Sequence, residues 1–511
     1  MVRVKRLRGI GAVLAGALLL AGCSDTGSAK GAKDAAGPSK SGSGPADLVP
    51  MPAAVSISWS RCDDSSFECG TLSVPVDYGS TSGPKIKIAL IRQKATGPDR
   101  IGALLVNPGG PGGSGIAFAR YAASAFPKSV LQRYDIVGFD PRGVGESAPV
   151  HCLTDSRMDA YTQLDPTPDD PAEEQALVTG FTDFGKGCEA MSSQLLGHVS
   201  TAEAARDMDQ IRSALGEPKL NYVGASYGTF LGATYAELFP GKVGRFVLDG
   251  AVDPSQPAVT ANRLQGGGFE TALDAYVDDC VAGGSCFLGA TRDEALTRIR
   301  TLLTDLDARP LPGDGKRSVN EAIATTGILS PLYSRDQWPD LTVALKAAFR
   351  GDGLPLLELN DVYYERGSDG HYANLMFANA AVNCLDSPAA ASSPDQVKTQ
   401  VDEFRQTSPT FGRALAWAGL SCGEWPIAPT GKPHEIHAPG AAPILVVGTT
   451  RDPATPYAWA QALARQLDSG HLLTYDGDGH TAYLRGSACI DTAVDTYLLT
   501  GQTPPDGKTC N

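Results

Sequence analysis

The sequence predicts an α/β fold, in which helices cover both faces of a mainly parallel sheet and a long helical insertion interrupts the chain. Three observations carry this prediction. Strand-like runs alternate with helical patterns, which is typical of a parallel sheet built from successive strands and helices. One strand passes directly into a helix through Gly224-Ala225-Ser226-Tyr227-Gly228. Residues 251–442 then separate this part of the chain from the last predicted strands.

The predicted strands are short and mostly apolar, as expected for strands covered on both faces. Residues 85–88 alternate polar and apolar side chains, which predicts a strand with one exposed face that continues to residue 91. The other predicted strands are residues 103–106, 135–139, 221–223, 245–248, 444–447 and 472–475. Residues 201–215 form a predicted helix, because Ala204, Met208 and Ile211 recur at helical spacing before Gly216.

The turn around Ser226 is the most informative motif. A strand that runs straight into a helix needs a tight turn, and glycines at 224 and 228 remove the Cβ atoms that would collide there. A G-x-S-x-G motif in this context is the nucleophile elbow of an α/β-hydrolase fold. A serine hydroxyl is a weak nucleophile, so Ser226 predicts a histidine and an acid nearby.

A glycine-rich loop, residues 107–115 (NPGGPGGSG), follows the strand at 103–106. It lacks the Lys-Ser/Thr ending of a P-loop. Residues 110–115 match G-x-G-x-x-G literally, but a dinucleotide cofactor would be scarce outside the cell, where the leader described below directs the chain. We interpret the loop as part of an oxyanion hole, with the backbone N–H groups of Gly110 and Tyr227 as donors.

The acid and the base are predicted from strand ends. Asp452 follows the strand at 444–447, and His480 lies in a glycine-rich loop after the strand at 472–475. The chain order Ser226, Asp452, His480 is that of α/β-hydrolases. In this hypothesis His480 accepts the proton of Ser226, and Asp452 fixes the tautomer of the imidazole.

Alternatives exist for both roles. Asp249 also follows a strand and is the alternative acid. Asp140 and Arg142 are interpreted as structural residues that pair with each other. Six further histidines lack the strand-end context and are interpreted as structural or surface residues: His151, His198, His371, His434, His437 and His471.

The N-terminus predicts export. Four basic residues precede an apolar run at residues 10–20, which is typical of a secretory signal and too short for a membrane span. The run ends in Leu20-Ala21-Gly22-Cys23, which resembles a bacterial lipobox. We therefore expect a signal peptide at residues 1–22 and a lipid on Cys23, with an ordinary signal peptide as the alternative. Residues 23–46, rich in Gly, Ser, Ala and Lys, are the expected flexible tether.

The other ten of the eleven cysteines form an even set, which in an exported chain implies disulfides. We pair neighbours in order: Cys62–Cys69, Cys152–Cys188, Cys280–Cys286, Cys384–Cys422 and Cys489–Cys510. None of these cysteines has C-x-x-C spacing, so no metal site is expected.

The formal net charge of −14 becomes −18 when the four basic residues of the leader, Arg3, Lys5, Arg6 and Arg8, are removed. An acidic surface argues against nucleic acid as a partner. It is compatible with substrates that carry a free amine.

Residues 251–442 are expected to form a mostly helical cap, inserted after the sixth strand between the two parts of the hydrolase core, residues 47–250 and 443–511. Thr291 and Glu294 form a capping-box pattern. Residues 337–349 and 394–404 are further predicted helices. A cap in this position would lie over Ser226 and restrict substrate entry; a decoration remote from the site is the alternative.

From about Val55 to its C-terminus, the chain resembles the exported tripeptidyl aminopeptidase branch of the proline iminopeptidase family, whose members are actinobacterial α/β-hydrolases. The resemblance is carried by residues 107–115, 140–143 (DPRG), 224–229 (GASYGT) and the segment from Cys422 to Cys510. Intracellular iminopeptidases have His-Gly-Gly-Pro-Gly where this chain has Pro108-Gly109-Gly110-Pro111-Gly112. The missing histidine fits the exported branch.

The resemblance implies a cofactor-independent exopeptidase that removes short units, such as tripeptides, from a peptide N-terminus. Capture of a free amine then requires acids in the cap, for which Asp386 and Glu424 are candidates beside cysteines, with a surface role as the alternative. A carboxylesterase or lipase with the same triad is the second functional hypothesis. A non-catalytic binding lipoprotein is the third.

Overall fold

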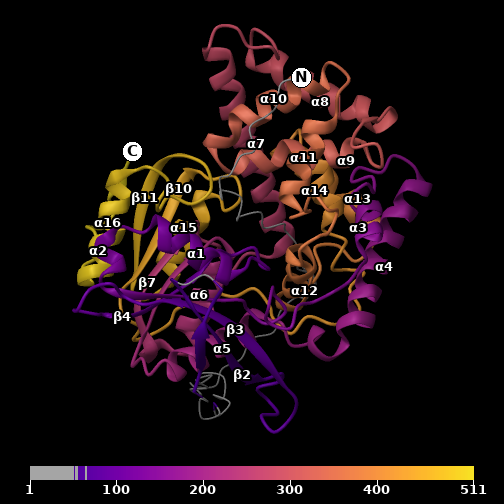
Figure 1. The fold of residues 1–511 in the computed structure, drawn as a ribbon. Coiled ribbons are helices and arrows are strands. Elements are labelled where there is room, and N and C mark those ends of the chain that lie inside the picture. The colour runs from indigo at the N-terminus through magenta and orange to yellow at the C-terminus, as the bar shows by residue number, and fades with distance from the viewer. Residues whose placement is uncertain (1–50, 52–55, 64–65) are drawn as a thin grey trace, which may run out of the picture.

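A mixed sheet lies in the left and lower part of the molecule as drawn in Figure 1, and helices occupy the upper right. The computed structural model describes residues 51, 56–63 and 66–511, and within them ten strands join this sheet. The predicted signal peptide, Cys23 and the tether lie outside the described residues. In spatial order the strands are β1 (Ser58–Arg61), β2 (Glu68–Pro75), β3 (Lys85–Gln93), β5 (Tyr134–Phe139), β4 (Gly102–Asn107), β6 (Leu220–Ala225), β7 (Val243–Asp249), β10 (Ile444–Arg451), β11 (Gly470–Asp478) and β12 (Thr509–Cys510).

The sheet is antiparallel at one end and parallel from β5 onward. β1, β2, β3 and β5 pair antiparallel in turn. Every later neighbouring pair is parallel. The carboxyl ends of the parallel strands therefore meet at one edge, where ligands bind in open α/β sheets. β1 and β2 were not predicted from the sequence. When the strands are counted along the chain from β2, β7 is the sixth, and the insertion follows it.

Two helical layers cover the sheet, and alternate residues of the buried strands face them. In β4, Leu104 and Val106 pack with α1 (Gly115–Ala125), α2 (Lys128–Leu131) and α16 (Ala488–Thr500). Ala103 and Leu105 face the opposite layer, made of α5 (Thr201–Ala214), α6 (Tyr227–Leu238) and α15 (Tyr457–Gln466). Burial on both faces explains why the strands are apolar runs in the sequence.

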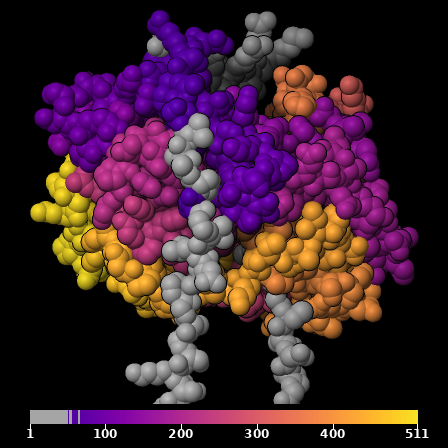
Figure 2. All heavy atoms as spheres, turned by 90° about the horizontal axis from the view of Figure 1, so that it is seen from below, coloured from indigo at the N-terminus to yellow at the C-terminus, as the bar shows by residue number. Residues whose placement is uncertain are grey.

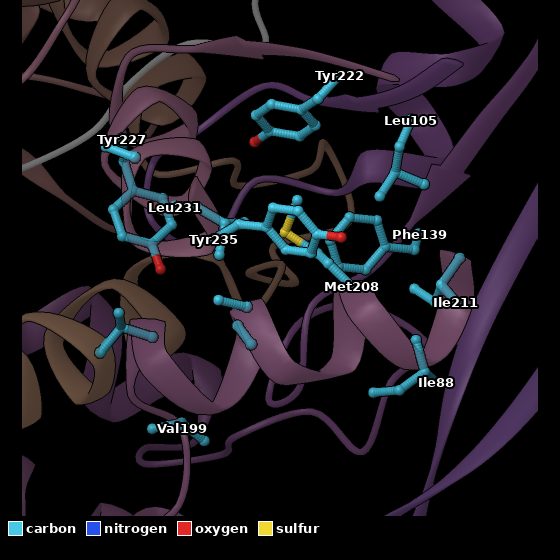
Figure 3. Close-up of a cluster of buried hydrophobic side chains, with 14 of the residues drawn as sticks. Ile88, Leu105, Phe139, Val199, Met208, Ile211, Tyr222, Tyr227, Leu231 and Tyr235 are labelled. Carbon is cyan, nitrogen blue, oxygen red and sulfur yellow. The ribbon is translucent and has the colours of Figure 1, made fainter. Parts of the chain in front are cut away.

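The helix α5 supplies much of the second layer. Its residues Met208 and Ile211 meet Leu231 and Tyr235 of α6 and side chains of the strands (Figure 3). Each large side chain buried here contributes about 1.5–3 kcal/mol relative to exposure. The predicted helix at 201–215 is confirmed, and it fixes the helix that follows the nucleophile turn.

The predicted helical insertion is also confirmed. Between β7 and β10 the chain forms eight α-helices with its own core, drawn in rose to orange shades in Figure 1. Thr291 accepts a hydrogen bond from the Glu294 N–H, as the capping pattern predicts. The helices are α7 (Ala258–Ala282), α8 (Arg292–Ala308), α9 (Glu321–Leu329), α10 (Trp338–Ala348), α11 (Leu354–Tyr363), α12 (Leu375–Asp386), α13 (Pro394–Thr407) and α14 (Gly412–Ala418). Short pieces between them are β8 (Leu311–Pro312), β9 (Ser318–Val319), η2 (Ser330–Tyr333) and η3 (Arg335–Gln337).

A second excursion, not anticipated from the sequence, packs against this insertion. Helices α3 (Asp155–Tyr161) and α4 (Pro171–Leu196) leave the sheet after β5. Leu177 of α4 is buried together with Val397 and Phe404 of α13 and Trp417 of α14. Seen from below, the purple surface of this excursion lies beside the orange surface of the insertion (Figure 2). The two segments therefore share an interface.

Five disulfides join neighbouring cysteines in order, which confirms the predicted pairing. Cys384–Cys422 ties α12 to the segment after α14, and Cys489–Cys510 ties α16 to β12. Across the described residues, none of the helices combines the length and the apolar character needed to cross a membrane.

Asp140 and Arg142 are both buried, but the predicted pairing between them is wrong. Arg142 donates to both carboxylate oxygens of Asp207 at 2.7 Å. It also donates to backbone carbonyls, including that of Val76. Asp140 instead accepts from the Ser114 hydroxyl at 2.7 Å and holds the start of α1. A buried guanidinium has five donors, which several acceptors satisfy better than one carboxylate.

Candidate active site

Ser226 lies in a strained turn at the carboxyl end of β6. Its φ of 57° and ψ of −127° are rare for a residue with a Cβ atom. A Cβ at Gly224 would collide with the carbonyl oxygen of Gly228, so the predicted requirement for glycine holds. Such strain persists only where the surrounding structure enforces it, and it is concentrated at functional sites.

The glycine-rich loop after β4 lies directly on this turn. A Cβ added to Gly109, whose φ is +93°, would lie 2.9 Å from both the Ser226 Cβ and the Tyr227 nitrogen. The loop thus packs on the backbone around Ser226, with Gly110 as the residue that follows Gly109. Within the described part of the chain, neither the Gly110 nor the Tyr227 N–H group donates to an acceptor. Two free donors beside a candidate nucleophile are the arrangement that an oxyanion needs.

Asp452 and His480 meet in the buried interior, 2 % and 3 % exposed. The His480 Nδ1 lies 2.9 Å from each carboxylate oxygen of Asp452. Asp452 also accepts from the N–H groups of Ala454, Thr455 and Thr481, which fix its orientation. The His480 Nε2 is buried and has no partner among the described residues. This nitrogen is available to accept a proton.

Asp249, at the end of β7, connects the serine turn to the histidine loop. Its backbone carbonyl accepts from the Ser226 N–H at 2.9 Å. Its carboxylate accepts from the N–H groups of Ala482 and Tyr483, at 3.0 and 2.9 Å. A Cβ at the next residue, Gly250, would lie 3.1 Å from the His480 Cε1. Ser226 and His480 therefore lie on either side of this strand end.

Asp249, the alternative acid, therefore contacts a different part of the histidine loop from Asp452. The Asp249 carboxylate binds the backbone after His480, whereas Asp452 binds the imidazole itself. Burial raises the pKa of Asp249 to about 6, although its backbone hydrogen bonds and the charge of His480 act in the opposite direction.

The insertion contacts the site from two sides. The Tyr333 carbonyl, in η2, accepts from the His480 N–H at 2.8 Å, and the two rings pack edge to face with centroids 5.7 Å apart. On α12, Asn379 donates to the carbonyl of Pro111 in the glycine-rich loop at 3.1 Å. These contacts exclude the alternative of a remote decoration. Neither residue was singled out by the sequence, because neither lies in a motif.

Asp386 is held by the core of the protein. Its carboxylate accepts from the backbone N–H and the hydroxyl of Thr201, and that hydroxyl contacts the Tyr227 hydroxyl at 2.6 Å. Figure 3 shows the Tyr227 hydroxyl directed toward α5, whose first residue is Thr201. Burial raises the pKa of Asp386 to about 7, although the Thr201 hydrogen bonds lower it. Asp386 therefore positions Tyr227 and is not open to an incoming amine.

Glu424, the other candidate for amine capture, is half-buried and accepts from the Thr182 hydroxyl on α4 at 2.9 Å. This contact joins the segment after α14 to the excursion α3–α4. The structure gives Glu424 a bridging role between these segments.

We predict that Asp386→Asn changes stability in a pH-dependent way. The folded state keeps the proton of Asp386 up to about pH 7, whereas the unfolded chain loses it near the ordinary value of 3.8. The wild-type carboxyl therefore costs stability progressively as the pH rises through this interval. The melting temperature of the variant relative to wild type should rise between pH 5 and pH 8.

Glu424→Gln, the same acid-to-amide change at the other candidate, is measured in parallel. KM for peptide substrates should be unchanged in both variants. A large rise in KM in either variant would restore the hypothesis of amine capture.

One group of carboxylates among the described residues is close enough to share a cation. Oxygen atoms of Asp165, Asp307 and Glu321 lie within 4.8 Å of one another. Burial and the two like charges raise the pKa of Glu321 to about 7, although the Thr167 hydroxyl lowers it. A proton on Glu321 can therefore relieve the repulsion, and no metal is required to explain the group.

Known proteins resemble this chain over most of its length. A family model described as TAP-like protein matches residues 408–510, which include Asp452 and His480. Serine protease Hip1 of Mycobacterium tuberculosis is 40% identical over 476 residues, which cover 89% of this chain and 91% of the relative. Carboxylesterase B of the same organism is 40% identical over 469 residues, with 89% of each chain covered.

A third relative, the tripeptidyl aminopeptidase of Streptomyces lividans, is 34% identical over 474 residues, which cover 89% of this chain and 86% of the relative. Its alignment, like that with Hip1, spans both the sheet and the helical insertion. The chain therefore belongs to the α/β-hydrolase family of serine peptidases that includes Serine protease Hip1 and tripeptidyl aminopeptidase.

Proposed function

We propose that this protein is an exported exopeptidase that removes short units, most simply tripeptides, from the free N-terminus of peptides. Ser226 is the nucleophile, His480 the general base and Asp452 the acid that orients it. One observation carries the proposal. The His480 Nδ1 lies 2.9 Å from the Asp452 carboxylate, and the buried Nε2 of the same ring has no partner among the described residues. The end of β7, whose Asp249 carbonyl binds the Ser226 N–H, lies beside this ring. The tripeptidyl aminopeptidase relative supports the choice of substrate.

In the proposed reaction, the His480 Nε2 removes the proton of the Ser226 hydroxyl as its oxygen attacks the scissile carbonyl carbon. The negative charge that develops on the carbonyl oxygen is stabilised by the N–H groups of Gly110 and Tyr227, each worth about 3 kcal/mol. His480 then gives its proton to the leaving amine, and the acyl group remains on Ser226. Water, deprotonated by His480, releases the acyl unit and restores the serine.

The enclosure of the site supports an enzyme that acts on chain ends. Ser226 is 8% exposed, and both Tyr333 and α12 of the insertion contact catalytic segments. An internal segment of a folded protein would have to enter and leave through this cover. A peptide end has to enter only once, so the cover favours an exopeptidase.

Product analysis tests the proposal. A free peptide and its N-acetylated form are incubated with wild type and with Ser226→Ala, and the products are identified by mass spectrometry. We expect release of a tripeptide from the free peptide by wild type only. Equal cleavage of both peptides would refute recognition of the amine, and cleavage of neither would refute peptidase activity on these substrates.

Ester hydrolysis is the second candidate function, because Carboxylesterase B is as similar to this chain as Serine protease Hip1 is. The same triad would cleave an acyl ester through the same acyl-enzyme. Acyl esters and peptide amides with the same acyl unit should be assayed in parallel. A kcat/KM that is far higher for long-chain acyl esters than for every peptide tested would favour the esterase.

We also propose export with a lipid on Cys23, since the leader carries basic residues, a short apolar run and a lipobox-like end. The lipid would attach the enzyme to the outer face of the cell membrane, with residues 24–46 as the tether. Cys23→Ser should move the protein from the membrane fraction to the medium. An unchanged distribution would refute the anchor.

A further inference from the structure

A cavity of about 230 Å³ lies between the insertion and the excursion α3–α4. Its walls come from α3, α4, α7, α9, α11, α12 and α14, which span distant parts of the sequence. Aromatic side chains make up much of the lining, including Tyr161, Phe181, Phe184, Tyr364 and Trp417. The fold therefore builds an aromatic chamber from the two segments that leave the sheet.

One wall of this chamber reaches the catalytic histidine. Phe269 and Tyr363 line the cavity and pack against Tyr333, with ring centroids 5.3 and 6.5 Å from that of Tyr333. The ring of Tyr333 in turn packs against that of His480 at 5.7 Å. Two aromatic layers, Phe269 with Tyr363 and then Tyr333, thus connect the chamber wall to the base.

Another wall reaches the glycine-rich loop. Asn379 lines the cavity, and its Nδ2 donates to the Pro111 carbonyl at 3.1 Å. Its Oδ1 accepts from the Asn383 Nδ2 at 3.0 Å, so both polar atoms of Asn379 are occupied. The chamber is therefore separated from the glycine-rich loop beside Ser226 by one side chain, that of Asn379.

The lining residues include no Asp, Glu, His, Lys or Arg; the polar ones are threonines, a serine, an asparagine, a tryptophan and tyrosines. A charged side chain would lose its hydration in this chamber without gaining a partner. An apolar cavity of about 150 Å³ is large enough to take up benzene, so this larger one has room for an aromatic or branched aliphatic side chain. Its chemistry selects apolar groups.

We infer that this chamber is a specificity pocket that binds one apolar side chain, aromatic or branched aliphatic, of the unit released from the peptide. The inference rests on the proposed exopeptidase function. The enclosed side of the site must hold the N-terminal unit, because the rest of the peptide has to extend to solvent. The pocket adds a requirement on side-chain identity that the triad itself does not impose.

The test uses free peptides in which each position of the released unit is in turn Phe, Leu, Ala, Asp or Lys. For wild type we expect kcat/KM at one position to be at least tenfold higher with Phe or Leu than with Asp or Lys, since small differences in apolar contact give about 10–200-fold discrimination. Similar values at every position would overturn the inference.

Two variants then link the preference to the chamber. Ala418→Phe, on α14, should fill the cavity and lower kcat/KM for the preferred Phe peptide at least tenfold while sparing the all-Ala peptide. Phe181→Ala, on α4, enlarges the cavity and should shift the preference toward larger side chains. Ala308→Phe, at an exposed position of α8, is the matched control and should behave as wild type.

An unchanged preference in both folded cavity variants would overturn the inference, and Phe181→Ala decides the matter alone if Ala418→Phe does not fold. Hydrolysis of a small acetate ester, which requires the triad and not the chamber, is measured in every variant. Ester cleavage without any peptide cleavage by wild type would show that the proposed peptidase function is wrong. Peptide cleavage with no side-chain preference would refute the pocket alone.

Discussion

Ser226→Ala is expected to lower kcat for peptide hydrolysis by roughly 10⁶-fold, the loss seen when the nucleophile of a serine protease triad is removed. The hydroxyls that follow Ser226 most closely in the sequence already have partners. The Tyr227 hydroxyl contacts that of Thr201 at 2.6 Å, and the Thr229 hydroxyl donates to the Ser226 carbonyl. Without the serine oxygen the His480 Nε2 can activate only water, and the acyl-enzyme cannot form.

The measurement combines steady-state kinetics with labelling by a fluorophosphonate probe, which reacts with activated serines. Wild type should be labelled at Ser226 and the variant should not be labelled. Ser124→Ala, at an exposed position near the end of α1, is the matched control and should retain both labelling and rate. Labelling of the Ser226→Ala variant at another serine would transfer the role of nucleophile to that residue.

The residues of this site that were predicted from the sequence share a property. Each lies in a short sequence pattern that predicts the local backbone structure around it. The Ser226 turn needs glycines at fixed offsets, and the structure shows the contact that requires one of them. Asp452 and His480 each follow an apolar strand, and parallel strands end at one edge of the sheet. Their contact at 2.9 Å is a consequence of that topology.

The parts that were missed depend on contacts between distant segments. Tyr333, Asn379 and the excursion α3–α4 have no motif, and their positions follow only from how the insertion packs on the core. The predicted pairing of Asp140 with Arg142 failed for the same reason, because the partner of Arg142 is Asp207 on α5. The proposal of Asp386 as an amine ligand did not foresee that α12 buries it against Thr201.

The choice between Asp249 and Asp452 as the acid could not be made from the sequence pattern alone. Both Asp249 and Asp452 follow strands of the sheet, and the sequence offers each as the acid. The structure separates them by the atoms they contact: Asp452 binds the imidazole of His480, and Asp249 binds the backbone of Ala482 and Tyr483. This difference yields a second prediction with a large effect.

Asp452→Asn is expected to lower kcat by roughly 10⁴-fold while leaving the fold intact, as the same change does in a serine protease triad. The Oδ1 of Asp452 accepts from the N–H groups of Ala454 and Thr455 at 2.9 and 2.8 Å, so the amide oxygen of asparagine takes this position. Its NH₂ group then faces the His480 Nδ1. The imidazole must accept at Nδ1 and carry its proton on Nε2, where it can no longer receive the proton of Ser226.

Asp249→Asn is the matched acid-to-amide control, and we expect it to lower kcat by less than about tenfold, because Asp249 acts on the histidine loop and does not contact the imidazole. Rates are compared for variants whose melting temperatures show that they are folded, since both carboxylates accept backbone hydrogen bonds in the interior. If Asp249→Asn instead caused the 10⁴-fold loss and Asp452→Asn did not, the acid of this site would be Asp249. The contacts with His480 would then describe a resting geometry from which the histidine loop moves before the reaction.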